Sequence, residues 1–101
     1  MPIAYDATAS DGQGSITSLT FSHTCTGSNR ILFVAPVLDI TASDLVSGVT
    51  YNGVAMTQIN KRAGTVSFAY LYYLINPATG ANNVVISTTS STTIRGMSAS
   101  Y

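Results

Sequence analysis

The chain has 101 residues, and its four basic side chains balance its four acidic ones, so its formal net charge is zero. Only 8% of the residues are charged, against about 25% in an ordinary soluble domain. The length predicts a single domain over residues 1–101 with a modest core. The balanced charge does not supply the basic surface by which proteins bind nucleic acid, so we expect no nucleic-acid partner.

We also expect no membrane insertion, because no stretch approaches the roughly 18 consecutive apolar residues of a membrane helix. Residues 1–10 have neither a basic region nor an apolar run, so a signal peptide is not expected. Few charges together with many Ser, Thr, Gly and Asn residues are typical of extracellular and virion β-proteins. We therefore expect the protein in a virion or at an extracellular surface.

The first predicted strand spans residues 15–25, where polar and apolar side chains alternate. This alternation places Phe21, His23 and Cys25 on the inner face of the strand. Cys25 is the only cysteine, so an intrachain disulfide is excluded.

A turn over residues 26–29 follows, in which Gly27 or Asn29 is expected to adopt a positive φ. Residues 31–38 are apolar on both faces, as in a central strand that is covered on both sides. Pro36 has no N–H group, which indicates an edge or a bulge at that end of the strand.

Residues 39–48 are rich in turn formers and predict a loop. Asn52-Gly53, which lies between alternating residues, is the strongest short-range signal for a hairpin with a type I′ turn. A two-residue turn fixes the register of its flanking strands, so four apolar side chains should share one side and face the core. They are Val49, Tyr51, Val54 and Met56.

The aromatic segment 64–76 predicts a strand, because aromatic and β-branched residues favour strands. Its faces carry Val66, Phe68, Tyr70, Tyr72 and Leu74 on one side, and Ser67, Ala69, Leu71 and Tyr73 on the other. After a loop over residues 76–83, segments 84–89 and 92–101 predict two last strands, with Gly96 marking a bulge.

About six short strands without a helix predict an all-β fold, namely an antiparallel, jelly-roll-like β-sandwich. One face of the aromatic strand can line the core, but a chain of this size has little material to cover the other face. We therefore expect strands of a neighbour to complete the module. The expected core residues are Phe21, Ile31, Phe33, Phe68 and Tyr70.

His23 and Cys25 are the strongest chemical signal, because residues i and i+2 of a strand point the same way. Zinc needs about four ligands, and the chain has no other His or Cys. The sequence therefore favours two inner-face residues, with His23 hydrogen-bonded to a backbone, Ser or Thr group. A Cys25 nucleophile activated by His23 is the less favoured alternative. We expect no catalytic residue, no metal site and no cofactor.

Two loops each carry two carboxylates five residues apart, Asp6 with Asp11 and Asp39 with Asp44. Calcium sites use such loops, but Asx-turns explain these residues more simply. Lys61 is the only lysine. It could form an isopeptide bond of the kind found in surface adhesins, but the chain has no glutamate to catalyse it, and the residue is expected in an exposed turn.

Four tyrosines could form a platform on which sugar rings stack, namely Tyr51, Tyr70, Tyr72 and Tyr73. The simpler interpretation places them in the core and at its rim. We expect the interaction surface of the protein at Leu71, Tyr72 and Tyr73.

Four segments follow one another in a familiar order: SLTFSHTCTGSNRILFV, VSGVTYNGVAMT, YLYYLINPATGANNVVIS and IRGMSASY. Together they resemble a module that recurs in phage structural proteins and in large secreted bacterial surface proteins, over roughly residues 17–101. The resemblance implies a β-sandwich with a structural or adhesive role and without catalytic residues. The familiar modules are longer, which implies that this chain is a fragment or a short version of one.

The leading hypothesis is therefore a non-enzymatic structural module that assembles with its own copies or with neighbouring subunits in a virion, a fibre or a cell-surface array. The alternative is a carbohydrate-binding or adhesion module that uses surface tyrosines to bind glycans. A hydrolase ranks third, because a glycosidase needs a pair of carboxylates within reach, whereas the four aspartates lie in predicted loops.

Overall fold

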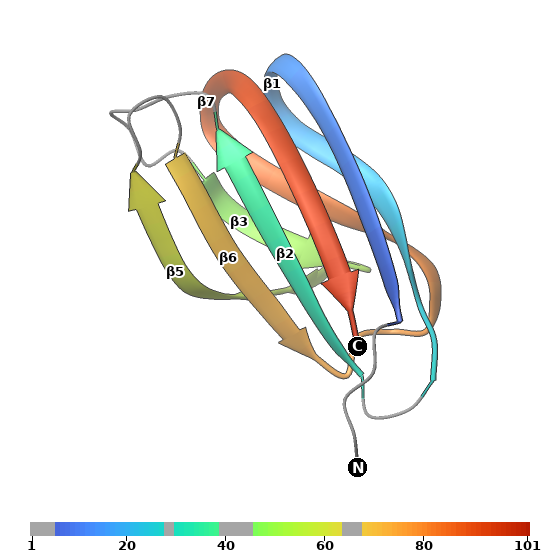
Figure 1. Ribbon diagram of the computed structural model, residues 1–101. Helices are drawn as coiled ribbons and strands as arrows, with labels where there is room; N and C mark the ends of the chain where they lie inside the picture. The colour runs from blue at the N-terminus through green and yellow to red at the C-terminus, as the bar shows by residue number, and fades with distance from the viewer. Residues whose placement is uncertain (1–5, 28–29, 39–45, 64–67) are drawn as a thin grey trace.

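The computed structural model describes residues 6–27, 30–38, 46–63 and 68–101. These residues form strands and connecting turns without any helix, so none of them belongs to a helix that could cross a membrane (Figure 1). The strands are β1 (Ala7–Cys25), β2 (Ile31–Leu38), β3 (Val46–Tyr51), β4 (Val54–Ala55), β5 (Thr57–Ala63), β6 (Phe68–Ile75) and β7 (Gly80–Ser100).

The strands form one antiparallel sheet in the order β4-β3-β7-β2-β6-β5, and β1 pairs with β7 beside this path. β1 and β7 run together as a long ribbon, and both bend back at the same end of the molecule (Figure 1). The bend coincides with register shifts in β1 between Gln13 and Ile16 and between Ile16 and Ser18. As a result, the sheet folds over on itself and is nearly closed into a barrel.

The predicted all-β, antiparallel class is confirmed. The expected number of about six strands is too low, because counting the two halves of the bent strands separately gives nine. The sandwich and its jelly-roll-like arrangement are not confirmed, since the strands belong to a single continuous sheet.

The bend divides the sheet into two layers. The first layer contains residues 7–13 of β1, residues 94–100 of β7, and strands β2, β6 and β5. The second layer contains residues 18–25 of β1, residues 80–87 of β7, and strands β3 and β4. The chain crosses from the second layer to the first at Met56, between β4 and β5.

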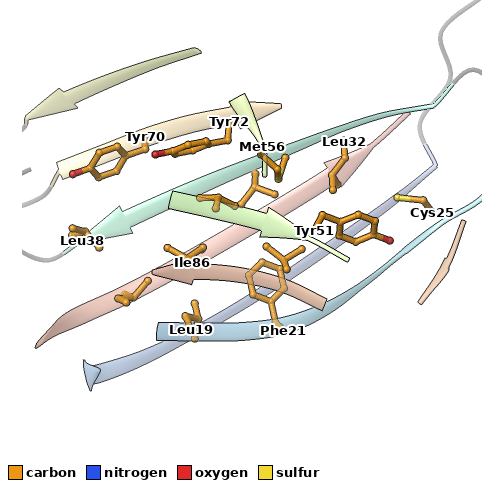
Figure 2. Close-up of a cluster of buried hydrophobic side chains, with 14 residues drawn as sticks. Leu19, Phe21, Cys25, Leu32, Leu38, Tyr51, Met56, Tyr70, Tyr72 and Ile86 are labelled. Atoms are coloured by element: carbon orange, nitrogen blue, oxygen red, sulfur yellow. The ribbon is translucent and has the colours of Figure 1, made fainter. Parts of the chain in front are cut away.

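The side chains that point between the two layers form the core (Figure 2). Strand alternation explains its composition, because every second residue of each strand faces inward. The buried hydrophobic residues are Leu19, Phe21, Cys25, Leu32, Val34, Leu38, Val49, Tyr51, Met56, Tyr70, Tyr72, Val84, Ile86 and Ile94.

The expected core is only partly right. Phe21 and Tyr70 are buried, whereas Ile31 and Phe33 are half-buried on the opposite side of β2. The error arises because residues 31–38 are apolar throughout, so alternation cannot reveal which face is inside. Phe68 is also half-buried and stacks on the Tyr70 ring, with ring centroids 5.0 Å apart.

Pro36 lies neither at an edge nor in a bulge, because β2 is central, between β7 and β6. The pairing of β2 with β6 is instead interrupted between Val34 and Val37, which accommodates the missing N–H of the proline. Gly96 does not mark a bulge either. It pairs in register with Pro36 on one side and with Asp11 on the other.

The predicted hairpin is confirmed. Asn52 and Gly53 have φ values of 52° and 76°, as a type I′ turn requires, and Tyr51 pairs with Val54. The side chain of Val54 is 51% exposed, because it lies at the tip of the hairpin, so the expectation that it faces the core is wrong. The other three apolar side chains are buried: Val49, Tyr51 and Met56.

Several strand boundaries differ from the prediction. The first strand begins at Ala7, residues 46–48 belong to β3 instead of a loop, and β5 was not expected as a strand. The predicted strands 84–89 and 92–101 are parts of the single bent strand β7. Expectations for Asn29, Asp39, Asp44, Val66 and Ser67 concern residues outside the described ranges.

Replacing Gly96 with alanine is expected to lower the free energy of unfolding by about 1–3 kcal/mol through overpacking. A Cβ atom at this position would lie 2.7 Å from Ile86 Cδ1 and 2.9 Å from Phe21 Cε1. Urea unfolding measures the loss. Gly48→Ala is the matched control, because nothing lies within 4 Å of its added Cβ; equal losses in the two variants would contradict the packing role of Gly96.

Candidate functional site

His23 bridges the two layers of the sheet through side-chain hydrogen bonds. Its ring is 1% exposed and points from the second layer toward the first. Nδ1 lies 2.6 Å from Ser98 Oγ, and Nε2 lies 2.8 Å from Ser100 Oγ. Both ring nitrogens therefore have partners, which a buried imidazole requires. The expectation that His23 bonds to a backbone, Ser or Thr group is confirmed.

The hydrogen bonds continue from Ser100 to Asp6. The Ser100 hydroxyl donates to Asp6 Oδ2 at 2.8 Å, and the backbone N–H of Thr26 donates to the same oxygen at 2.9 Å. The Thr26 hydroxyl also donates to Asp6 Oδ1. Since Ser100 donates to the carboxylate, its oxygen accepts the Nε2–H of His23. In the neutral ring Nδ1 then carries no proton and accepts from the Ser98 hydroxyl, which lies 2.6 Å from Nδ1 but 3.4 Å from its other acceptor, the Ala9 carbonyl. This chain of hydrogen bonds defines the neutral tautomer of His23.

The electrostatics agree with a neutral imidazole. Burial lowers the pKa of His23 below its ordinary value of 6.5, and the nearby Asp6 carboxylate only partly opposes this effect. The hydrogen bonds from Thr26, followed by the one from Ser100, lower the pKa of Asp6. At neutral pH the cluster therefore pairs an uncharged His23 with an ionised Asp6.

The order of these groups does not suit hydrolysis. A catalytic triad places the histidine between the nucleophile and the carboxylate, whereas here the hydroxyl of Ser100 lies between Asp6 and His23. Cys25 is fully buried, so a substrate cannot reach its thiol. No group of three metal-ligating side chains occurs within the described ranges. We interpret the cluster as a structural connection between the layers.

The tyrosine platform is not formed. The Tyr51 side chain is wholly buried, and its hydroxyl donates to the carbonyl of His23 at 2.9 Å. Burial is the main cause that raises the pKa of Tyr51 to about 12. Tyr70 and Tyr72 are also buried, at 3% and 5% exposure, so the expectation that Tyr72 belongs to a surface is wrong. Tyr73 alone of the four lies on the outer side.

The remaining candidates have separate local roles. Asp6 binds Thr26 and Ser100, whereas Asp11 accepts a hydrogen bond from the N–H of Gly12 at 2.8 Å, so these two carboxylates do not share a site. Lys61 is exposed and lies in β5, not in a turn.

The predicted turn glycine has its expected conformation. Gly27 adopts a φ of 82°, so the expected positive φ is confirmed at this position. Arg30 connects this turn to the segment that follows β6, because its guanidinium donates to the carbonyl of Gly27 at 2.6 Å and to the carbonyl of Pro77 at 2.8 Å.

The outer side of the first layer carries a continuous apolar surface, which we call the outer apolar face. Cross-strand neighbours point to the same side of a sheet, and here the outward neighbours on β2, β6 and β7 are apolar or aromatic, except Arg95 at one end of β7. Leu71 and Tyr73 point outward, as expected. The outer apolar face consists of Ile31, Phe33, Ala35, Val37, Ala69, Leu71, Tyr73, Ile75, Met97, Ala99 and Tyr101.

Several of these side chains protrude. Ile75 is 59% exposed, Met97 58% and Leu71 36%. A shallow hollow of about 500 Å³ lies on one side of Phe33, and it is lined by Ile31, Phe33, Leu71, Ala99 and Tyr101. A second hollow of about 580 Å³ lies between Phe33, Met97 and β1. The sequence indicated a strand with two apolar faces but not the contribution of β7 to this surface.

The outer side of the second layer has a different composition. Its outward positions on β1, β3 and β7 are mostly small and polar: Thr20, Ser22, Thr24, Thr50, Ala81, Asn83, Val85 and Ser87. Such side chains suit contact with water, since they hydrogen-bond to it. The contrast makes the outer apolar face a distinct feature of one side of the molecule.

Cys25 is expected to react with a thiol reagent at least about 100-fold more slowly in the native protein than in urea, because reaction requires the core to open. The side chain has 0% exposure. Absorbance after addition of a chromogenic disulfide measures the rate. A native rate close to that of the unfolded chain would contradict the burial of this thiol.

The stability of the protein is expected to fall as the pH drops below about 6.5, the ordinary pKa of histidine. The unfolded chain then takes up a proton on His23, whereas the folded chain does so only at lower pH, because burial lowers the pKa of this residue. Urea unfolding between pH 7.5 and 5 measures the slope. His23 is the only histidine, so His23→Gln should remove this pH dependence; an unchanged slope would contradict the assignment.

Comparison with protein-family models finds no match for this chain, and comparisons with curated proteins and with solved structures find no significant match.

Proposed function

We propose that the chain is a non-enzymatic structural module that assembles with copies of itself or with neighbouring subunits in a virion, a fibre or a cell-surface array. The outer apolar face is the observation that carries this proposal. It spans three adjacent strands of the first layer, and its most exposed large side chains are Ile75 and Met97.

Exposure of the outer apolar face to water is unfavourable in free energy. Burying apolar surface releases roughly 25 cal/mol per Å², and soluble monomers rarely leave continuous apolar patches above a few hundred Å² uncovered. The formal net charge of zero also removes the repulsion that keeps proteins apart. Association with a partner covers the face and removes this cost.

The resemblance of the sequence to modules of phage structural proteins and bacterial surface proteins supports the same proposal. The proposal also includes a β-sandwich that is completed by a neighbour, and a location in a virion or at an extracellular surface. The carbohydrate-binding alternative is less well supported, because Tyr51, Tyr70 and Tyr72 are all buried.

Purified protein at micromolar concentration is expected to form a species larger than the 10.5 kDa chain, because association buries the outer apolar face. Sedimentation velocity over a range of concentrations measures this directly. A single species of monomer mass at every concentration would contradict the proposal. Binding on a glycan array by a chain that stays monomeric would favour the carbohydrate-binding alternative.

A further inference from the structure

We infer that the outer apolar face binds the same face of a second copy of this chain, with the two sheets stacked about a twofold axis that runs across the strands. This inference rests on the proposed function and names the partner and its orientation. In such a pair each strand lies over its own copy and runs in the opposite direction.

The outer side of the first layer is large enough for a stable pair. Its five strands, β1, β7, β2, β6 and β5, lie about 4.8 Å apart, and seven residues at about 3.3 Å rise make the layer about 24 by 23 Å, or roughly 1,100 Å² for two copies, with the outer apolar face on the three central strands. A specific interface needs at least about 1,000 Å² in total. The flanking strands β1 and β5 contribute polar outward residues such as Ser10 and Asn60, and a polar rim around an apolar centre is the usual anatomy of an interface.

The register of β2 and β7 makes the centre of the face self-complementary. Ala99 lies beside Phe33 in one row, and Met97 lies beside Ala35 in the next row. Each row thus holds one large and one small side chain, in opposite order. A twofold axis between the two rows exchanges them, so that Met97 lies over Ala99 of the second copy and Phe33 lies over Ala35. Large side chains then meet small ones, which close packing requires.

The exposed surface fits this arrangement. Met97 is 58% exposed, and the hollow of about 500 Å³ beside Phe33 is lined in part by Ala99 and Tyr101. In the stacked pair, Met97 of each copy enters this hollow in the other. Methionine suits such a contact because its flexible, polarisable side chain fills irregular gaps and packs well against aromatic rings.

Charge selects the antiparallel orientation over the parallel one. Arg95 and Arg62 lie in one cross-strand row at the same end of the face, on either side of Val37 and Ala69. Stacking with parallel strands would bring four guanidinium groups together. In the antiparallel arrangement the row with Arg95 lies over the end of the second copy that carries Tyr101. There a guanidinium group can interact with the tyrosine ring.

The experiment compares the same substitution inside and outside the face. Met97→Glu is expected to raise the dissociation constant of the pair at least about 100-fold, because it buries an unpaired carboxylate in an apolar hollow. Val54→Glu is the matched control, since Val54 is 51% exposed but lies at the hairpin tip of the second layer. Sedimentation velocity measures association, and urea unfolding verifies that each variant folds. Ala99→Glu provides a second variant in the face.

Mixing two variants tests the orientation. Met97→Lys and Ala99→Glu chains are each expected to be monomeric at a concentration at which the unmodified chain pairs. Their mixture should form a heterodimer, detected by native mass spectrometry, because Lys at position 97 then meets Glu at position 99 of the other copy. Parallel stacking does not bring these positions together, so failure to recover a heterodimer would overturn the proposed arrangement.

The outcomes separate this inference from the proposed function. Association of the unmodified chain that Met97→Glu leaves unchanged would overturn the inference while the structural role stands, with another surface as the contact. Equal loss of association in Met97→Glu and Val54→Glu would overturn it too, because the effect would then not be specific to the face. A chain that remains monomeric throughout would overturn both.

Discussion

The pairing of β1 with β7 along nearly their whole length is the constraint on which the rest of the structure depends. The two strands remain paired from Ala7 opposite Ser100 to Cys25 opposite Gly80, through a bend marked by register shifts. Because both strands bend together, β7 offers its free edge to β2 in one layer and to β3 in the other. One ribbon thereby generates both layers and the space between them.

The His23 cluster joins the two layers at one end of this ribbon. Hydrogen bonds to Ser98 and Ser100 cross the core, and Ser100 extends the chain to Asp6. Polar groups buried in a core are costly unless each finds a partner, and no buried side-chain polar atom within the described ranges lacks one. Such a network favours one relative placement of the layers, because a sliding layer would leave the imidazole unpaired.

The two outer sides of the folded sheet differ in composition, and the proposed assembly depends on this difference. Ser, Thr and Asn residues dominate the side that suits water, whereas apolar residues dominate the other. The strands of the described ranges form only these two layers, so no further layer among them covers the apolar side. The proposed partner therefore takes the place of a layer that a larger domain would provide for itself.

Local patterns in the sequence determined much of the secondary structure. The Asn52-Gly53 turn and its register follow from turn chemistry, since both residues tolerate a positive φ. The alternation of the aromatic strand correctly separates Tyr70 and Tyr72 from Leu71 and Tyr73. Strand β5, by contrast, has a polar sequence without alternation, and only its pairing with β6 makes it a strand.

The candidate site was predictable only in part. The sequence alone shows that the chain has few metal-ligating side chains. Its alternation also predicts that His23 and Cys25 point inward, and both are buried. The serine partners of His23 lie 75 and 77 residues away, so no local pattern could identify them. The sequence also did not determine which side of β2 faces inward, because a strand that is apolar at every position shows no alternation between polar and apolar side chains.

The sequence by itself therefore determined the all-β class, the hairpin, the two faces of the aromatic strand and the lack of charge. Only the tertiary structure decided that β1 and β7 each bend into both layers, that Phe33 lies outside, and that Met97 and Ala99 join it on one surface. The physical reason is that these features depend on pairing between distant strands. Local propensity and periodicity report how a segment alternates, whereas long-range register decides which of its sides is covered.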